Sequence, residues 1–499
     1  MKRLCSIVLA LCLLLGVAPV HADLQTKPFA EVGEVYRNVL ENHLSRPEAR
    51  QLVQGALQHV SQQAAEQTLQ LSVPADDDTL PELEKRLTEW QSRYNLDGKT
   101  LNRWAINGML GTLKDPHTAF FTKEELNRFQ AGVENEFVGF GFRLRMQGGT
   151  LMIRELIPQS PAAASDLQKG DQLLAVDGLS LKGKSFEEAY ALLKGEEGSE
   201  AVLTVYRPSQ KQERQIRLKR AFLSIPEVEG DRFAGSDIGY IHLETFGSDA
   251  AYQLRDKLTE FSQAGKPLRG LLLDLRDNGG GYLTAARDIA GLFMEEGLLM
   301  ITTNRNGVEL ETWVRNGRDI TYPVRILVNE GTASASELLA GALRDHGIAK
   351  LIGTKTYGKG SAQQVIPLLD GDALKITLQE YFTPKHTTVN HVGLTPDLTV
   401  EEHLSQVVEG LRSLGVNSFE LREGNGDTFV NGVAFPVIEP LFKREQGGIA
   451  VRAAVLATLL RDKEIGNQGY VPLAPYLQKN KQLSILQENG DMVLRFQSP

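Results

Sequence analysis

Short apolar runs alternate with helical patterns through the centre of the chain. Each run is bounded by turn residues, which is typical of a fully buried strand. Four such runs stand out: 239–243, 270–275, 324–328 and 350–354. Amphipathic stretches that end near Phe261, Phe293 and Gly347 separate them. Strands that alternate with helices predict an α/β core sheet flanked by helices, which we place at residues 223–400.

The segments on either side of this core have different patterns. Residues 23–136 carry apolar residues at helical spacing and predict a helical N-terminal domain. Residues 137–222 read as short strands with one amphipathic helix at 186–193. Residues 401–499 begin with a helix and predict a small α+β extension that resembles the stalk modules of bacterial envelope proteins; the alternative is an extension that packs on the core. We interpret the polar stretch 423–427 as a linker. The prediction is a multidomain α/β protein.

Composition narrows the class of protein. The 499 residues are enough for about three or four domains. Hydrophobic residues make up 41% of the chain, so a sizeable core is expected. The formal net charge is -9 and there is no long run of lysine and arginine, which argues against nucleic acid as a partner.

The first 22 residues predict a signal peptide that is cleaved after Ala22. Lys2 and Arg3 precede an apolar stretch that is short for a membrane span, and small residues stand at the cleavage position. The alternative is an uncut N-terminal anchor. Both cysteines, Cys5 and Cys12, fall inside this segment. Export without disulfides indicates the periplasm or cell envelope of a bacterium.

The candidate chemistry lies between residues 324 and 363. Ser334 stands where a predicted strand gives way to a helix, and Lys359 lies between two glycines after the next strand. A neutral lysine can deprotonate a serine, and free N–H groups at the helix start can hold an oxyanion. The alternative is structural: Ser334 and Glu337 also match a helix-capping box, and Lys359 could be a solvated turn residue.

A glycine run after a neighbouring strand supports a site at this edge. Gly279, Gly280 and Gly281 follow the apolar run 270–275, and ligands bind past such strand ends in open α/β sheets. The glycines alone could merely form a sharp turn. A histidine base, His242 or His346, is the alternative to the lysine. We predict no metal and no cofactor, and we find no HExxH motif.

A nucleotide-binding pattern has to be weighed against this interpretation. Residues 178–185, GLSLKGKS, match the P-loop spacing, with Lys184 as the phosphate-binding lysine. The flanking elements belong to the strand pattern of residues 137–222, and the loop lacks further glycines. We therefore prefer the interpretation without nucleotide.

Residues 137–222 resemble a PDZ domain in the order of their strands and helix. The run Phe140-Gly141-Phe142 is similar to the loop that binds a peptide's terminal carboxylate in PDZ domains. Successive backbone N–H groups in such a loop can form an anion site, and the following strand can pair with an extended peptide. The resemblance implies recognition of protein tails; the alternative is an ordinary hairpin with a glycine bulge.

Four motifs in order, preceded by a DPHT turn at 115–118, resemble the C-terminal processing, or tail-specific, serine proteases. They are GLLLDLRDNGGGYL, ILVNEGTASASELLAGALRDHG, GTKTYGKGSAQQ and the trailing YFTP and VGLTPD. The resemblance implies a Ser-Lys peptidase that cuts proteins near their C-termini. It makes Ser334 the nucleophile, with Ser336 only its neighbour, Lys359 the general base, and Gln363 the residue that orients the lysine.

The same resemblance implies further site residues and partners. The oxyanion hole would consist of the backbone N–H groups of Ala335 and Gly280, with Gly279 as a substitute. The substrates would be proteins with unstructured C-termini. A homo-oligomer, expected as a dimer through the N-terminal helices, and an envelope adaptor protein are further expectations. The competing hypothesis is a non-catalytic PDZ-type scaffold that binds tails without cleaving them.

Overall fold

The computed structural model describes residues 28–147, 149–424, 427–436, 439–445, 448–488 and 490–497. The predicted signal peptide, with both cysteines, lies outside these residues. Within them, no helix combines the length and the apolar character that a membrane crossing requires. The chain forms two compact units, one of which holds residues up to Asn127 together with 303–308 and 362–379. Each unit is described by itself.

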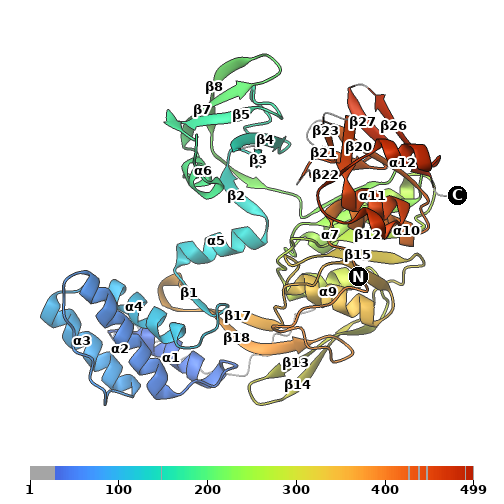
Figure 1. Ribbon diagram of the computed structural model, residues 1–499. Helices are drawn as coiled ribbons and strands as arrows, with labels where there is room; N and C mark the ends of the chain where they lie inside the picture. The colour runs from blue at the N-terminus through green and yellow to red at the C-terminus, as the bar shows by residue number, and fades with distance from the viewer. Residues whose placement is uncertain are drawn as a thin grey trace, which may run out of the picture. The chain divides into compact units, whose positions relative to one another are not determined.

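The first unit is a helical bundle that packs on one strand segment, as predicted for the N-terminal region (Figure 1). Its helices are α1 (Ala30–Asn42), α2 (Ala49–Glu66), α3 (Leu80–Tyr94) and α4 (Gly98–Gly111). Their buried apolar residues form one core with Leu374 and Ile376. Both residues belong to β18 (Ala373–Phe382), which pairs antiparallel with β1 (Ala119–Phe121). This pairing connects the helices to the chain segment that follows Lys359.

The second unit contains the predicted α/β core sheet, whose strands run in the order β10-β11-β12-β15-β16-β19. Only β10 is antiparallel to its neighbour. The strands are β10 (Val228–Arg232), β11 (Ile238–Leu243), β12 (Gly270–Asp274), β15 (Val324–Val328), β16 (Ala349–Gly353) and β19 (Leu398–Thr399). All five residues of β12 are buried, as expected for a central parallel strand.

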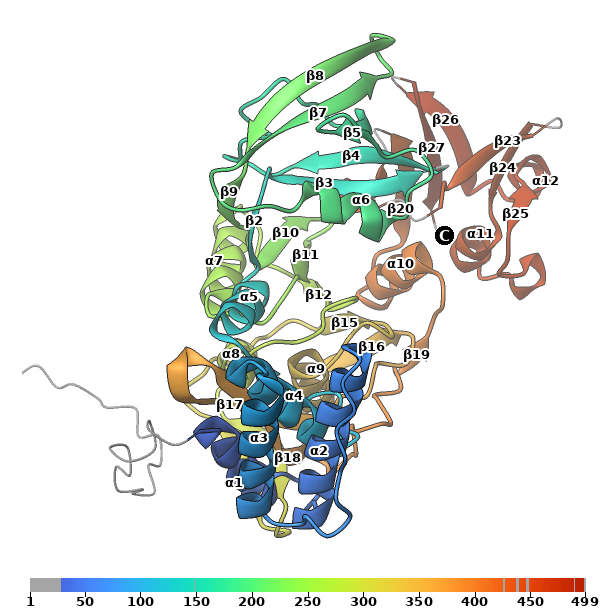
Figure 2. The same cartoon turned by 90° about the vertical axis from the view of Figure 1, so that its left-hand side faces the viewer.

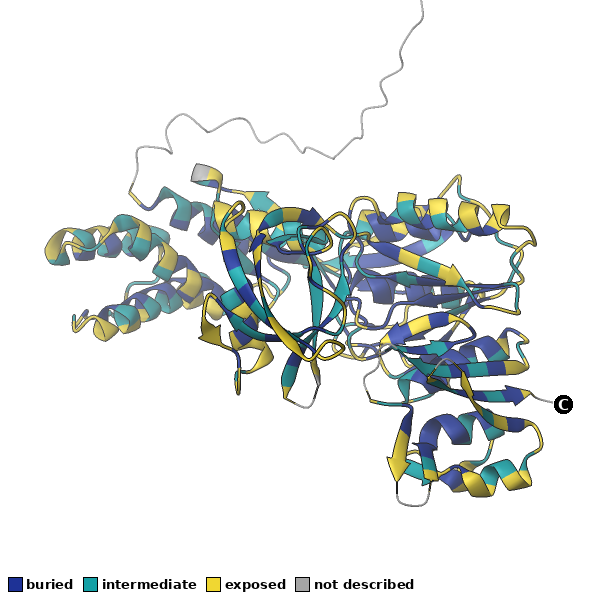
Figure 3. Ribbon diagram, turned by 90° about the horizontal axis from the view of Figure 1, so that it is seen from above, coloured by how far each residue is buried: buried dark blue, intermediate teal, exposed yellow. Residues whose placement is uncertain are grey.

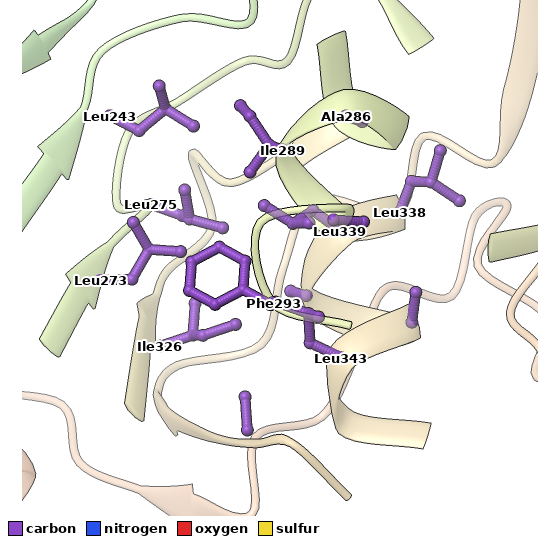
Figure 4. Packing of buried hydrophobic residues seen from close by; sticks show 14 of the residues in the cluster. Leu243, Leu273, Leu275, Ala286, Ile289, Phe293, Ile326, Leu338, Leu339 and Leu343 are labelled. Atoms are coloured by element: carbon purple, nitrogen blue, oxygen red, sulfur yellow. The ribbon is translucent and has the colours of Figure 1, made fainter. Parts of the chain in front are cut away.

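Helices cover both faces of this sheet. Alternate strand residues, such as Leu273 and Ile326, pack with Ile289, Leu338 and Leu343 on one face (Figure 4). The covering helices are α7 (Ala250–Gln263), α8 (Leu283–Ala290) and α9 (Ala335–Asp345). The intervening residues face α10 (His403–Ser413) and the C-terminal region on the other side. The core sheet is therefore buried between two layers, which fixes its strand ends.

The PDZ-like region forms a separate sheet with the strand order β3-β4-β5-β7-β8 (Figure 2). Its elements are β3 (Phe142–Gln147), β4 (Thr150–Leu156), β5 (Gln172–Val176), β6 (Leu179–Ser180), α6 (Phe186–Leu193), β7 (Glu200–Arg207) and β8 (Gln212–Lys219). Strand β3 lies at the edge of this sheet. The P-loop-like stretch 178–185 consists of β6 and the turn before α6, where Ser185 caps the helix. The start of α6 is therefore a structural part of the PDZ-like region.

A two-stranded ribbon and a helix lie next to this domain in the chain. Strand β2 (Glu136–Gly139) pairs with β9 (Ala221–Ser224), and α5 (Lys123–Val133) precedes them. Residues 294–323, for which we predicted no element, form β13 (Gly297–Asn304) and β14 (Glu309–Val314). Residues after Gly360 form β17 (Ser361–Pro367), which pairs with β18.

The C-terminal region is a small α+β module, as predicted, with many buried residues (Figure 3). One sheet contains β20 (Ser418–Gly424), β21 (Asp427–Val430), β22 (Val433–Pro436), β26 (Leu483–Glu488) and β27 (Asp491–Gln497). A second contains β23 (Phe442–Glu445), β24 (Gly448–Arg452) and β25 (Tyr470–Pro472), with α11 (Ala453–Leu460) and α12 (Ala474–Lys479) nearby in sequence. The linker prediction was wrong: Glu423 and Gly424 pair antiparallel with Thr428 and Asp427, so these residues belong to the strand pair β20–β21.

Candidate active site

Ser334 lies at the junction between β15 and α9, in an unusual backbone conformation. Its φ is 56° and its ψ is -118°, a region that residues with a side chain rarely adopt. The residue is 7% exposed. The Ser334 N–H donates to Glu337 Oε2 at 3.0 Å, so the predicted capping box is formed. The cap and the nucleophile interpretations therefore do not exclude each other.

The Glu337 carboxylate joins the two residues that the sequence selected. Glu337 is fully buried. Its Oε1 accepts from the Thr356 hydroxyl and from the Gly358 N–H, the latter at 2.8 Å. Its Oε2 accepts from Ser334 N–H and, at 2.8 Å, from Lys359 N–H. One side chain thus holds the backbones of Ser334 and Lys359 next to each other.

Tyr381 makes a second connection between the same two residues. Its buried hydroxyl is 2.9 Å from the Ser334 carbonyl oxygen and 2.8 Å from the Lys359 carbonyl oxygen. Burial, reinforced by the nearby Glu337 carboxylate, raises the pKa of Tyr381 well above its ordinary value. The hydroxyl therefore stays protonated, and its single proton is shared between the two carbonyls. Sequence reasoning missed this role, although Tyr381 begins the YFTP motif.

Asn278 ties the glycine-rich loop to the start of α9. Its Nδ2 donates to the Leu243 carbonyl, and its Oδ1 accepts from the Gly280 N–H at 2.9 Å. Its own carbonyl accepts from the Ala333 N–H at 3.0 Å and from the Ser336 hydroxyl at 2.9 Å. Asn278 is buried and so is Ser336, whose hydroxyl is occupied by this bond.

Gly280 lies directly against the candidate nucleophile. A methyl group on its Cα would lie 2.8 Å from Ser334 Cβ and 2.9 Å from the Ala335 nitrogen, and its φ is 100°. Its N–H, which we predicted for the oxyanion hole, donates to Asn278 in this structure. The Ala335 N–H belongs to the first turn of α9, where N–H groups lack an intrahelical partner. The oxyanion role of both groups stays a prediction.

Adding one methyl group at Gly280 is expected to lower kcat about 100-fold, because the loop must move away from Ser334 and its left-handed backbone becomes strained. Gly279→Ala is the matched control: a Cβ at Gly279 meets no atom within 4 Å, and its φ is not positive. We expect Gly279→Ala to keep its activity within about 3-fold. Steady-state cleavage of a labelled unfolded protein measures both. Equal effects of the two substitutions would contradict the placement of Gly280.

Gln363 lies in the other compact unit, four residues after Lys359 in the chain. It is on β17, and its Nε2 donates to the Thr377 hydroxyl at 3.2 Å. Ser334, Lys359, Gly280 and Ala335 all belong to the second unit. The structure therefore brings together four of the predicted residues, and the orienting role of Gln363 stays a prediction.

A buried ion pair supports the loop that carries Asn278. The Arg276 Nε donates to Asp274 Oδ1 at 2.8 Å, and the Tyr240 hydroxyl donates to the same carboxylate at 2.9 Å. Burial would raise the pKa of Asp274, but the Arg276 guanidinium outweighs it and lowers that pKa to about 2. Arg276 also donates to the His403 carbonyl at 2.9 Å, which anchors the loop on α10. The sequence did not reveal this support.

The two histidines that were alternatives to Lys359 as the base each contact another group of the fold. His346 caps the C-terminal end of α9, about 18 Å along the helix from Ser334, and its Nε2 is 2.7 Å from the Leu298 carbonyl oxygen. His242 is paired with Glu244 at 3.1 Å. Burial lowers the pKa of His242, but Glu244 and Asp274 offset this and raise it overall. The assignment of Lys359 as the base stays a prediction.

A buried acid lies under the loop that contacts the glycine run. Glu227 is 2% exposed, and among the described residues its Oε2 has no hydrogen-bond partner. A Cβ at Gly247 would lie 2.3 Å from Glu227 Oε1, so the carboxyl lies directly against this loop. Burial, with smaller contributions from Glu134 and Asp249, raises the pKa of Glu227 from 4.5 to about 7.

Glu227→Gln is therefore expected to stabilise the protein above pH 7. Between pH 4.5 and pH 7 the folded state binds more protons than the unfolded state, so stability falls as the pH rises through this window, by about 3 kcal/mol. The variant should unfold at a higher temperature than the wild type at pH 8 and at the same temperature at pH 5. The exposed Glu260→Gln should show no such difference. If Glu227→Gln raised the unfolding temperature at both pH values, the charge of Glu227 would not be the cause of the stabilisation.

The PDZ-like domain carries a groove beside its edge strand. A cavity of about 330 Å³ is lined by the predicted loop, including Phe140, Gly141 and Phe142, and by Phe186 and Tyr190 of α6. The two aromatic rings of α6 stack and are 40% and 45% exposed. Gly141 has a φ of 88°, and a Cβ there would clash with Ser160 at 2.0 Å. The groove therefore suits an extended peptide that pairs with the edge strand β3 and places an apolar side chain against these rings.

The described residues contain no group of three or more histidine, cysteine or acidic side chains placed to hold a metal ion. The site combines a strained serine, a lysine whose backbone is held beside it, and the Ala335 N–H at the start of α9. This arrangement defines the class of the protein as a serine-type peptidase with an attached PDZ domain.

Comparisons with known proteins agree with this class. The sequence pattern of peptidase family S41 matches residues 237–400, and that of the PDZ domain matches residues 152–207. A carboxyl-terminal-processing protease from Synechocystis sp. is 35% identical over 311 residues, which cover 61% of this chain and 72% of that protein. The carboxy-terminal processing protease CtpB of Bacillus subtilis is 30% identical over 343 residues, or 66% of this chain and 71% of that protein.

Among solved structures, the photosystem II D1 C-terminal processing protease matches with 27% identity and a TM-score of 0.47, over 79% of this chain and 98% of that chain. The sequence relatives show the family: the chain belongs to peptidase family S41, the carboxyl-terminal-processing proteases. Its substrates are therefore proteins, and the hypotheses of a non-catalytic scaffold and of a nucleotide-binding protein are set aside.

Proposed function

We propose that the chain is an exported endopeptidase that cleaves proteins near their C-termini through a Ser334–Lys359 dyad. The observation that carries the proposal is the shared contact with Glu337, whose Oε2 accepts from the backbone N–H groups of both residues. A nucleophile and its base must lie within reach of each other, and this carboxylate keeps their backbones adjacent.

The reaction follows from the roles of the two side chains. The neutral Lys359 amine takes the proton of the Ser334 hydroxyl as Oγ attacks the scissile carbonyl carbon. The carbonyl oxygen becomes an oxyanion, which the N–H of Ala335 holds; the Gly280 N–H joins it by exchanging its bond to Asn278 for one to the substrate. The lysine then gives its proton to the leaving amine, and water hydrolyses the acyl-enzyme.

Gln363 completes the proposed site by orienting the lysine. A neutral amine has two N–H donors and one lone pair. An acceptor that holds one N–H turns the lone pair toward the serine hydroxyl. The Gln363 Oε1 can serve as this acceptor because its Nε2 already donates to Thr377.

The PDZ domain is proposed to capture the substrate tail in the groove described above. The loop at Gly141 would bind the terminal carboxylate, β3 would pair with the tail, and Tyr190 and Phe186 would contact its last side chain. A peptide with a free carboxylate and an apolar last residue should therefore bind more tightly than its amidated form. Fluorescence anisotropy with the two peptides measures the difference.

Export belongs to the same proposal. The predicted signal peptide would be removed after Ala22 and leave the enzyme in the periplasm or cell envelope. The mass of the purified mature chain tests this, since cleavage there makes Asp23 the first residue. A dimer through the N-terminal helices and an adaptor protein stay predictions.

Labelling with a fluorophosphonate tests the nucleophile. We expect the probe to attach to the full chain at one serine, and peptide mass spectrometry to locate it at Ser334 and not at Ser336. The products of unfolded casein should show cuts near the C-terminus. Attachment at another serine, or wild-type cleavage by Ser334→Ala, would overturn the proposal.

A further inference from the structure

A groove runs along α8 from the glycine-rich loop of the candidate active site; we call it the α8 groove. Its first part is a cavity of about 550 Å³ between α7 and α8, lined by Tyr282 and Gly247 at the end near the loop. Gly280, two residues before Tyr282, lies directly against Ser334. The α8 groove therefore begins next to the candidate nucleophile.

A second cavity, of about 480 Å³, continues the α8 groove toward the C-terminal end of the helix. Arg255, Asp288 and Leu292 line both cavities, so the two adjoin. Helix α8 has eight residues, and the second cavity reaches its C-cap, Gly291. Eight helical residues rise about 12 Å, which is the length of about four residues of extended chain.

The far end of the α8 groove is basic. Its charged lining residues are four arginines and one acid: Arg255, Arg287, Arg315, Arg318 and Asp288. Arg287 is already paired with Asp288 at 2.9 Å. Arg315 and Arg318 are exposed, and their side chains have no hydrogen bond or ion pair to any residue that the structure describes. In a chain with a formal net charge of -9, these two guanidinium groups are available to an anionic ligand.

Backbone contacts fix the turn that carries Arg315 and Arg318. The Gly317 N–H donates to the Glu295 carbonyl, and the Arg318 N–H donates to the Gly291 carbonyl, each at 2.9 Å. A Cβ at Gly317 would lie 2.1 Å from a backbone oxygen of the segment after α8, so the turn packs closely on this segment. The turn therefore holds both arginines at the end of α8 without using their side chains.

Aromatic side chains in the α8 groove indicate a polypeptide as the ligand. Tyr252 in the first cavity is 59% exposed, and Trp313 in the second is 39% exposed. The Arg255 guanidinium lies 5.1 Å from the centre of the Tyr252 ring. Aromatic rings pack on the apolar parts of a polypeptide, and guanidinium groups bind carboxylates. A small anion would use the arginines alone, whereas a peptide with acidic side chains uses the whole groove.

We propose that the α8 groove is a substrate subsite in which Arg315 and Arg318 bind acidic side chains about four to six residues from the scissile bond. The inference rests on the proposed function and adds a preference for acidic substrates. The near end of the groove differs, because the Glu134 carboxylate accepts from the Ser248 hydroxyl there at 2.8 Å. Acidic residues directly beside the scissile bond therefore gain nothing.

Paired peptides test the inference with the full-length mature enzyme. Each spans a casein cut site located by mass spectrometry and carries glutamates or glutamines about four to six residues from the cut, on one side or the other. On one side, we expect the glutamate peptide to have a kcat/KM about 5- to 10-fold above its glutamine partner, because charged groups add hydrogen bonds to arginine. The double variant Arg315→Gln/Arg318→Gln should remove this advantage and leave cleavage of the glutamine peptides unchanged. High salt should also remove it, since salt screens exposed charges.

A second double variant controls for net charge. Arg217→Gln/Arg444→Gln removes two exposed arginines elsewhere on the chain and should keep the glutamate advantage. Equal cleavage of glutamate and glutamine peptides on both sides of the cut would overturn the inference, as would an advantage that persists in Arg315→Gln/Arg318→Gln.

Two further outcomes separate this inference from its neighbours. Binding to phosphatidylglycerol vesicles that requires Arg315 and Arg318, without a glutamate preference in cleavage, would assign the arginines to a membrane surface and overturn the inference. The glutamine peptides report the proposed function by itself, because their cleavage should vanish in Ser334→Ala. Cleavage that persists in Ser334→Ala would overturn the proposed dyad, and the inference would fall with it.

Discussion

Lys359→Met is expected to lower kcat/KM by at least about 10,000-fold, since the loss of one member of a nucleophile–base pair removes most of the catalytic advantage. Methionine keeps the length and apolar stem of lysine but offers no base. The fold should survive, because methionine keeps the backbone hydrogen bonds of this position to Glu337 and Tyr381. Steady-state cleavage and thermal unfolding measure the two effects.

Lys359→Arg distinguishes a base from a positive charge. A guanidinium stays protonated at any pH at which the protein is folded, so it cannot accept the serine proton. We expect this variant to be as inactive as Lys359→Met. Lys355→Met, at an exposed lysine four residues earlier, is the matched control and should leave cleavage unchanged. Substantial cleavage by Lys359→Arg would show that the charge matters and that another group removes the proton.

The core sheet could be predicted because its strands are continuous apolar runs. Residues 270–275 were predicted as a buried strand, and β12 occupies Gly270–Asp274 with every residue buried. Strand β17 illustrates the limit: of its residues only Ser361 is buried, and Gln363 and Gln364 interrupt any apolar pattern. Its position depends on pairing with β18, a partner that local sequence does not specify.

Ser334 and Lys359 could be selected as candidates because each follows a predicted buried strand, where ligands bind in open α/β sheets. Ser334 lies between a strand and a helix, and Lys359 lies between glycines. Their supports could not be predicted in the same way. Glu337 looked like a helix cap, and its bonds to Gly358 and Lys359 span 21 and 22 residues. Only the folded chain brings these N–H groups to one carboxylate.

The polar residues that the sequence left without a role share one property: they are buried and make several hydrogen bonds. Asn278 joins the glycine loop to α9, and Tyr381 joins Ser334 to Lys359. Such residues are costly to bury unless their bonds are satisfied. Burial cannot be read from an isolated asparagine or tyrosine, and therefore motif matching selected Ser334 and Lys359 as candidates and missed the residues that hold their backbones together.

Glu337→Gln is expected to lower kcat about 1000-fold and the free energy of unfolding by about 3 kcal/mol. In the wild type, Glu337 Oε1 accepts two hydrogen bonds and Oε2 accepts two more, from three backbone N–H groups and one hydroxyl. A glutamine must place its N–H₂ where one of these oxygens was. Whichever way the amide turns, two buried donors then face another donor, and each such loss costs on the order of 1–3 kcal/mol.

The hydrogen bonds lost in Glu337→Gln lie at Ser334 and Lys359 or directly beside them, so we expect the substitution to lower catalysis as well as stability. If the amide turns one way, the Ser334 and Lys359 N–H groups lose their common acceptor; if it turns the other way, Thr356 and Gly358 lose theirs and the glycine turn before Lys359 is released. Glu330→Gln is the matched control, because this exposed carboxylate lies in the same loop region and accepts from the Thr354 hydroxyl at 3.0 Å, away from the dyad. A Glu337→Gln enzyme that unfolds earlier but keeps wild-type kcat would mean that the carboxylate stabilises the fold without aligning the dyad.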